Sequence, residues 1–561
     1  MSDRDKEWNF HLRTLSSSTR DSNFGNDSSL LQSVKKLNEL CRAEKSEDLI
    51  ARVYPQLNKV FQRSIASASQ SRNSDGVLLL AILQFFLDFG DVVLHDADPS
   101  LRIFFRSCLS REFSDPVVAE ETINFLKLNK RKLQTSFPTL LPQFYPLMLK
   151  LIAWHGEKFE KSFKTVFPAL VSPGSFLPLF PSIVDLPILV VALERVEKTS
   201  GPLIGSSIAS IQKSAAPEML LALMDEAYTG STIGDGGADS ESEDSSTMAS
   251  MDPLFLEFLK DENDGLAERH WTSSVMTSAL QAAINVPQSN RLKQALMITS
   301  RILGVYFALV LDDPNESLRC ALIPLLMARN STLFPDKNFA YQVQKRLLEF
   351  MLVAFQRSPH FVALLKKPII DRLGEAYDSP VKAELAVQLC WAIGEHGGGG
   401  GPHKDAAREL FESLELLLYE NLSSSRVGLS GLNSGSSSFR KTFQSRLLCY
   451  VVTAIAKLAT YHRELQPRAR VSLAKVARSK ISDVRVSRRA RDYLGLMDEP
   501  AICLSVLGPS QTSDENMQKP GVVNWREAGK QMVAHIPFYV LGQQEGPPYH
   551  DFSLSDIIQS R

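Results

Sequence analysis

Apolar residues recur at spacings of three and four along most of this chain, a pattern typical of amphipathic helices. The pattern starts near Leu30 and continues to Leu496, and no stretch shows the period-two alternation of a sheet. We therefore predict an all-α protein. The main helical segments are expected at 29–40, 46–63, 75–89, 100–108, 115–130, 253–260, 269–284, 288–311, 314–328, 338–356, 359–376, 404–420, 443–461, 467–478 and 482–496.

Prolines interrupt the helical pattern in two places. Pro55 lies inside the segment 46–63 and is expected to kink or split it, because proline lacks the backbone N–H that a helix interior uses. Residues 136–192 contain a series of prolines separated by apolar intervals. This arrangement predicts short helices joined by tight turns.

One helix is marked at both ends by its sequence. Ser379 is a suitable N-cap and Pro380 suits the first helical position, while a run of glycines follows at 397–401. Between Leu385 and Ile393 only Gln388 is polar. A helix that is apolar nearly all round is buried between neighbours.

Stacked amphipathic helices with a buried helix among them predict an α-solenoid of antiparallel helix pairs, of the HEAT or armadillo type. Such a protein buries a continuous core between neighbouring helices and offers long surfaces to partners. Stretches with few apolar residues divide the chain further. We expect a flexible N-terminus at 1–28, an N-terminal helical solenoid at 29–229, an acidic Ser/Gly-rich disordered linker at 230–251, a C-terminal helical solenoid at 252–498 with a Gly-rich loop at 397–401 and a Ser/Gly loop at 423–438, and a Pro-rich tail at 499–561.

Composition and charge change this picture little. Hydrophobic residues make up 44% of the 561 residues and charged residues 22%, as in ordinary soluble proteins. The 62 Lys and Arg residues balance 63 Asp and Glu residues, so nothing favours nucleic acid as the main partner. The first residues are too charged for a signal peptide, and the apolar runs are shorter than the about 20 residues that cross a bilayer. We expect a cytoplasmic or peripheral membrane protein whose scattered cysteines are buried thiols.

Catalytic signatures are missing from the sequence. It contains no G-x-x-x-x-G-K-[ST], H-E-x-x-H or G-x-S-x-G motif, and its histidines are not spaced as metal ligands. We therefore expect no enzyme, no metal site and no cofactor. The protein should act by binding partners.

A basic stretch between Arg463 and Arg491 is the best candidate for a functional surface. On two helices it would form a positive stripe able to meet anionic lipid headgroups or an acidic partner. The alternative, which the sequence slightly favours, is a solvated outer face with some pairing to neighbours. The candidate residues are Arg478, Lys480, Arg485, Arg488, Arg489 and Arg491.

The acidic linker contains candidate phosphorylation sites for an acid-directed kinase. They are Ser240, Ser242, Ser245 and Ser246, which lie beside Glu241, Glu243 and Asp244. A solvated linker without modification is the alternative.

The last third of the chain resembles the trunk of adaptins, the large subunits of vesicle-coat adaptor complexes. The resemblance rests on Leu389-Cys-Trp-Ala-Ile-Gly-Glu-His396, on the amphipathic segment 406–420, and on the pair 446–458 and 483–496, which resemble "A-x-x-K-L" and "D-x-x-V-x-x-R-A-x-x-Y". Histidine replaces the usual tyrosine at His396. Trp391, Gly394 and Glu395 are interpreted as packing and helix-end residues that identify the family.

Within the adaptins, the run 358–371 leading into the Trp391 helix is similar to the zeta-subunit family of the fifth adaptor protein complex, of a plant-like type. The resemblance implies a large subunit that pairs with a second large, a medium and a small subunit. It also implies sorting on late endosomes or lysosomes (vacuoles), peripheral binding to that membrane, and association with scaffolds like spatacsin and spastizin. Only residues 497–561 follow the trunk motifs, so no ear domain is expected. A HEAT-like scaffold or regulator outside vesicle traffic is the alternative.

Overall fold

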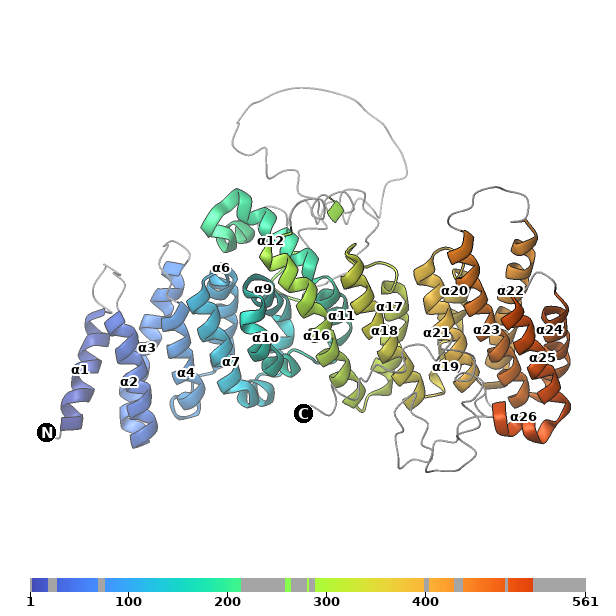
Figure 1. Cartoon of the computed structure of the whole chain (residues 1–561). Coiled ribbons are helices and arrows are strands. Elements are labelled where there is room, and N and C mark those ends of the chain that lie inside the picture. Colours follow the sequence, from blue (N-terminus) through green and yellow to red (C-terminus); the bar gives the residue numbers. More distant parts are fainter. Residues whose placement is uncertain are drawn as a thin grey trace, which may run out of the picture. The chain divides into compact units, whose positions relative to one another are not determined.

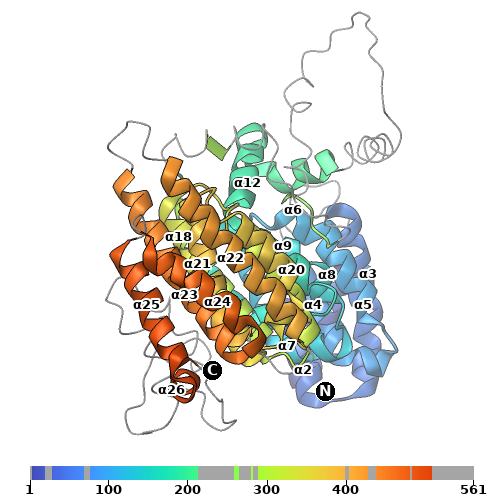
Figure 2. The same cartoon turned by 90° about the vertical axis from the view of Figure 1, so that its right-hand side faces the viewer.

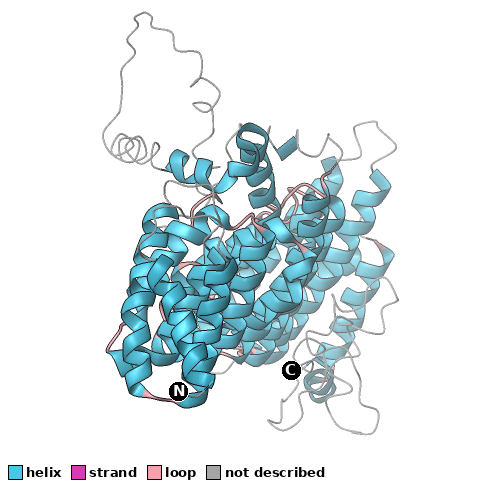
Figure 3. Ribbon diagram, turned by 90° about the vertical axis from the view of Figure 1, so that its left-hand side faces the viewer, coloured by secondary structure: helices cyan, strands magenta, loops and turns pink. Residues whose placement is uncertain are grey.

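The computed structural model is helical throughout the part of the chain that it describes, and no strand occurs there (Figure 3). The described residues are 3–18, 28–68, 76–212, 258–263, 280–281, 288–397, 403–427, 437–479 and 483–507. The predicted all-α solenoid is confirmed. The expected helices at 253–260 and 269–284 lie mostly outside the described residues, as does the linker at 230–251.

The described residues form two compact units. Unit 1 comprises residues up to Ile302 together with Phe334–Phe339, and unit 2 comprises Leu303–Leu333 and the residues from Ala340 onward. The division therefore falls inside helix α16, Asn290–Asp312, whereas the sequence placed it in the linker at 230–251. The reason is local packing, because Arg291 pairs with Glu197 (2.5 Å) and ties the start of α16 to unit 1.

Unit 1 begins with consecutive helices that lie side by side (Figure 1). The core of this unit is centred on α4, whose Leu79, Ile82, Leu83 and Phe85 are fully buried. Burying one such side chain contributes about 1.5–3 kcal/mol. The helices are α1 (Asp3–Ser18), α2 (Ser28–Glu44), α3 (Glu47–Ala68), α4 (Gly76–Val93), α5 (Ala97–Ile103), α6 (Ser110–Glu112), α7 (Pro116–Ser136), α8 (Leu140–Gln143), α9 (Tyr145–His155), α10 (Glu157–Val166), α11 (Phe176–Val184) and α12 (Leu186–Ser200), with a π-helical turn at Phe104–Leu109 and 3-10 turns at Phe167–Ala169 and Gly201–Leu203.

The proline-rich region folds as the sequence predicts, into the short helices α8 to α12. Pro146 and Pro187 lie in the first turns of α9 and α12, where a missing N–H costs no helical hydrogen bond. Pro55 and Pro181 are instead inside α3 and α11. The structure keeps α3 as one helix from Glu47 to Ala68, so of the predicted kink or split at Pro55 the split is wrong.

Unit 2 is a second stack of paired helices, packed side by side from α20 to α25 (Figure 2). Within it, α21 begins at the predicted cap, where the Ser379 hydroxyl accepts from the Lys382 N–H at 3.3 Å. The residues from Leu385 to Ile393 are buried, so the predicted buried helix is confirmed. The helices here are α17 (Glu316–Arg329), α18 (Lys337–Arg357), α19 (Phe361–Leu364), α20 (Lys366–Gly374), α21 (Pro380–His396), α22 (Lys404–Val427), α23 (Ser437–Tyr461), α24 (Gln466–Arg478), α25 (Val484–Asp498) and α26 (Pro500–Leu507), with a 3-10 turn at Arg463–Leu465.

Three expected irregular segments contain helix. Residues 3–18 of the expected flexible N-terminus form α1, because Trp8 and Leu15 share one face and are both buried. The helix α22 extends to Val427 and α23 begins at Ser437, which shortens the expected loop at 423–438. The expected tail begins with α26, whose Cys503 and Leu507 are buried. Of the glycine loop only Gly397 is described, and its N–H caps α21 by bonding to the Ile393 carbonyl at 2.8 Å.

Two described helices, α4 and α16, have the length and composition of membrane spans, and α11 with α12 would match as one bent span. The uninterrupted apolar runs in the sequence are shorter than a span, but the helices that contain them are longer than those runs. Within each of the two helices, 61% of the apolar window is buried inside the protein. For α4 the covering elements are α2, α3 and α7 of the same unit. Its apolar residues therefore serve helix packing.

Candidate functional surfaces

The segments that carry the adaptin-like motifs lie together in unit 2, on both sides of α23. On one side, α21 approaches α23 closely at Gly394, where a Cβ would lie 3.3 Å from the Ala454 Cα. Next to this contact, Lys457 of α23 forms an ion pair with Glu395 of α21. Their side chains are only 1% and 4% exposed. Near the rim of the same interface, the Arg446 guanidinium contacts the Glu384 carboxylate at 2.5 Å.

On the other side, the motif residues of α25 form its buried face. Asp483 caps the helix by accepting from the Arg485 N–H at 2.8 Å and also accepts from the Ser445 hydroxyl of α23 at 3.0 Å. Tyr493 is buried, and its hydroxyl lies 2.8 Å from the Thr453 hydroxyl of α23. These contacts fix α25 on α23.

The electrostatics of these contacts follow from their surroundings. Hydrogen bonds donated by the Arg485 side chain hold the pKa of Asp483 below its usual range, against the opposing effect of partial burial. Burial raises the pKa of Tyr493 to about 12, so its phenol stays protonated. The cap and the interhelical bond both persist at neutral pH.

Trp391, Gly394 and Glu395 therefore lie in a helix-packing interface. Trp391 is 7% exposed, and its ring meets the His396 ring edge-on at 5.7 Å. Their positions agree with the interpretation as packing residues. Within the described ranges no three His, Cys, Asp or Glu side chains are grouped to hold a metal.

The basic stretch divides into an exposed part and a paired part. Arg478 at the end of α24 and Arg485, Arg488 and Arg491 on α25 are exposed. The three arginines of α25 lie outside its buried face, and Arg485 also pairs with Asp483 at 3.2 Å. Lys480 lies outside the described residues.

Arg489 does not belong to this surface. The structure buries it to 2% exposure against α23, with its guanidinium 3.5 Å from the Thr453 hydroxyl. The expectation that it faces outward is corrected because positions 486, 489, 490 and 493 all fall on the helix face that packs on α23.

Other arginines of the stretch are engaged in ion pairs. Arg468 contacts Glu412 (2.9 Å) and Glu415 (2.6 Å) of α22, and Arg470 contacts Asp498 at 2.6 Å. These pairs fit the alternative of a solvated face with local pairing. The candidate surface is thereby reduced to Arg478, Arg485, Arg488 and Arg491, with Lys480 still open.

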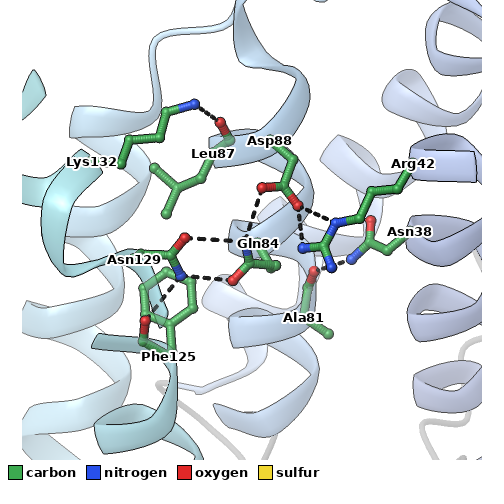
Figure 4. A network of polar contacts seen from close by, with 9 residues as sticks. All are labelled: Asn38, Arg42, Ala81, Gln84, Leu87, Asp88, Phe125, Asn129 and Lys132. Carbon is green, nitrogen blue, oxygen red and sulfur yellow. Dashed lines mark hydrogen bonds and ion pairs between the residues drawn. The ribbon is translucent and has the colours of Figure 1, made fainter. Parts of the chain in front are cut away.

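Unit 1 contains a polar network that the sequence reasoning missed, shown in Figure 4. The side chains of Gln84 on α4 and Asn129 on α7 exchange two hydrogen bonds, at 2.7 and 3.2 Å. Gln84 also donates to Asp88 (3.1 Å), which accepts from Arg42 of α2 at 2.9 Å. The network joins three helices in succession. In the sequence, Gln84 is an isolated polar residue within an apolar helical segment, and this was the available sign of the network.

A second missed feature is a fully buried lysine in α9. The Lys150 ammonium is 0% exposed and pairs with Asp261 at 2.7 Å, and it also donates to the Leu259 carbonyl. Asp261 belongs to the short described segment 258–263. A lysine among apolar residues, in Leu149-Lys150-Leu151, was the only local signal in the sequence. The serines at 240, 242, 245 and 246 lie outside the described residues.

Comparisons with known proteins extend the resemblance over most of the chain. A family model described as "AP-5 complex subunit, vesicle trafficking" matches residues 26–150. A second one, described as "AP-5 complex subunit zeta-1, C-terminal TPR repeats", matches residues 162–522. The likeness is therefore not confined to the last third.

Curated relatives match over nearly the same range. The AP-5 complex subunit zeta-1 of Mus musculus is 24% identical over 495 residues, which cover 86% of this chain and 55% of the relative. The Homo sapiens protein of the same name matches with the same identity and coverage. The chain thus spans about half the length of the curated relatives it matches.

Proposed function

Because the chain belongs to the family of AP-5 complex zeta subunits, we propose that it is a non-enzymatic large subunit of a heterotetrameric vesicle adaptor complex. It provides a helical scaffold for the other subunits and serves endosomal and lysosomal (vacuolar) protein sorting. The observation that carries this proposal is the match of residues 162–522, which contain all three motif helices around α23.

The architecture supports a scaffold role. A solenoid buries a continuous core and leaves its outer faces for partners. In unit 2 the family motifs are used for internal packing, through Glu395 with Lys457 and through Tyr493 with Thr453. We therefore expect residues outside the motifs to contact the partners.

The partners we propose are a second large, a medium and a small adaptor subunit, with large scaffolds like spatacsin and spastizin as further ones. The place of action is the cytoplasmic face of late endosomes or lysosomes (vacuoles). The exposed arginines 478, 485, 488 and 491 would meet anionic headgroups there, each contributing about 1 kcal/mol near the surface.

Affinity purification with quantitative mass spectrometry tests the assignment. The tagged full chain should recover one medium, one small and one other large subunit in equal amounts. A matched control is the Trp391→Ala variant, which should lose these subunits if they need unit 2 to be folded. Recovery of the chain as a lone monomer, or with a kinase or phosphatase, would favour a HEAT-like scaffold or regulator outside vesicle traffic.

A further inference from the structure

The last described helix, α26, is apolar on every side. Its eight residues, Pro500–Leu507, include one polar side chain, that of Ser505. A helix that is apolar all round is normally buried among its neighbours. Ile502 and Leu504 are nevertheless 52% and 55% exposed. Part of α26 is therefore an uncovered apolar surface.

The opposite side of α26 is packed within unit 2. Cys503 is buried, and its sulfur lies 3.2 Å from the Thr460 hydroxyl of α23. Neighbouring residues of a helix point about 100° to either side of one another, since a turn contains 3.6 residues. Ile502 and Leu504 therefore flank the packed side, and the exposed Ala501 lies between them on the far side. These three residues form the outer face of α26.

The segment best suited to cover this outer face is the apolar run Ile536–Leu541 of the same chain, whose sequence is Ile-Pro-Phe-Tyr-Val-Leu. The run lies within Gln531 to Gln544, the longest stretch beyond α26 without Asp, Glu, Lys or Arg. The helix α26 has none of these residues either. Contact between them would remove apolar surface from water without burying a charge.

The length of the chain permits this contact. Residues 508–535 join the end of α26 to the run, and a random coil of that length has an end-to-end distance of about 30 Å. This distance exceeds the length of α26, which is about 12 Å. Pro537 disfavours a helical backbone at Ile536. An extended run of this length spans about 20 Å, about twice the width of a helix, and can cross the outer face from Ile502 to Leu504.

We propose that Ile536–Leu541 packs in cis across the outer face of α26, over Ile502 and Leu504, and forms the last layer of unit 2. The tether favours this occupant over a second copy of the chain, because it supplies an effective concentration on the order of mM. The proposal does not depend on the adaptor role.

Site-specific photo-cross-linking in the full chain tests the contact. The photoreactive residue p-benzoylphenylalanine replaces Leu504, and mass spectrometry after irradiation identifies the residues to which it is attached. We expect cross-links to residues 536–541 within a monomer. Leu416 of α22, which is 60% exposed, is the matched control position. The same probe there should give at least tenfold fewer cross-links to residues 536–541.

Substitutions within the chain beyond α26 sharpen the test. The double variant Phe538→Ser, Tyr539→Ser should lower the cross-link yield from position 504 at least fivefold, because it removes the aromatic part of the run. Amide hydrogen exchange of α26 should become faster by a similar factor. Trp525→Ser removes an aromatic side chain outside the run and is the matched control, which should change neither quantity.

Three results would overturn the proposal. Cross-links between isotopically light and heavy chains, at the mass of a dimer, would assign the outer face of α26 to a second copy. Cross-links from position 504 to other parts of the chain, or no more cross-links than from position 416, would show that the run lies elsewhere. Equal effects of the Phe538–Tyr539 and Trp525 variants would show that the run makes no specific contact.

Discussion

Among the described residues, two lysine side chains are fully buried, Lys150 in unit 1 and Lys457 in unit 2, and each forms an ion pair with a carboxylate. Lys457 and its partner Glu395 both belong to long helices, and their side chains are 1% and 4% exposed. Lys150 is 0% exposed, and its partner Asp261 is 15% exposed. Both pairs join an ammonium to a carboxylate, and the exposure of the carboxylate differs.

This difference decides what each pair can do. In unit 2 neither partner can leave without separating α21 from α23, so the pair serves packing. In unit 1, Lys150 has a second acceptor in the Leu259 carbonyl, so the loss of the Asp261 carboxylate still leaves its ammonium a partner.

The largest expected effect is that of Glu395→Ala. It removes the carboxylate that pairs with the buried Lys457 and should lower the free energy of unfolding by about 3–5 kcal/mol. The double variant Glu395→Leu, Lys457→Met removes both charges and should restore most of this loss. Urea unfolding followed by circular dichroism measures both. A loss below about 1 kcal/mol in the single variant would contradict a role of the pair in packing α21 against α23.

Trp391→Ala should be nearly as damaging, with a loss of about 3–5 kcal/mol, because it removes a large buried side chain from the same interface. Leu416→Ala on α22 is the matched control, since that side chain is 60% exposed and its loss should change the stability by less than about 0.5 kcal/mol. The same urea titration compares them. Equal effects of the two variants would mean that α21 is not held in the core of unit 2.

Asp261→Asn should cost less, about 1.5–3 kcal/mol, because it removes one charged hydrogen bond and leaves Lys150 the Leu259 carbonyl. The loss should appear as faster amide hydrogen exchange confined to the segment 258–263. Amide exchange that increases across the whole of unit 1 would mean that Asp261 stabilises the packing of its unit, as Glu395 does in unit 2.

A smaller effect is expected from acid. The Arg106 side chain, through its hydrogen bond, holds the pKa of Glu262 below its usual range when the segment is bound. A lowered pKa stabilises the bound state above the pKa of the free carboxyl, and this stabilisation is lost as the pH falls through the lowered value. Protection of residues 258–263 from exchange, corrected for intrinsic rates, should therefore fall below about pH 4.5. The Glu262→Gln variant should not show this dependence.

The smallest effect on stability is expected from reversing Arg485, Arg488 and Arg491 to Glu, since all three are exposed. Binding to liposomes with anionic lipids should nevertheless weaken at least tenfold if these residues face a membrane. Reversal of Lys59, Lys127 and Arg131, which are exposed in unit 1, makes the same change in charge and is the matched control. Liposome co-sedimentation that is equally reduced in both variants would show only an effect of net charge.

The sequence by itself determined the helical class, the cap at Ser379, and the buried course of α21. Spacing of apolar residues and N-cap chemistry act within a few residues, so they are visible in the chain. The motif residues around Trp391 also marked the family. What they contact was not visible, because Lys457 is far from Glu395 in the sequence.

Only the tertiary structure decided which side chains meet. It buried Arg489, which the charge pattern had placed outside, because the packed face of α25 is set by α23. It gave the N-terminal residues a helix through the burial of Trp8 and Leu15. It also brought Asp261 to Lys150, a contact between segments that no periodicity links. Contacts between residues far apart in the sequence depend on how the helices stack. The spacing of residues within one helix does not specify that stacking.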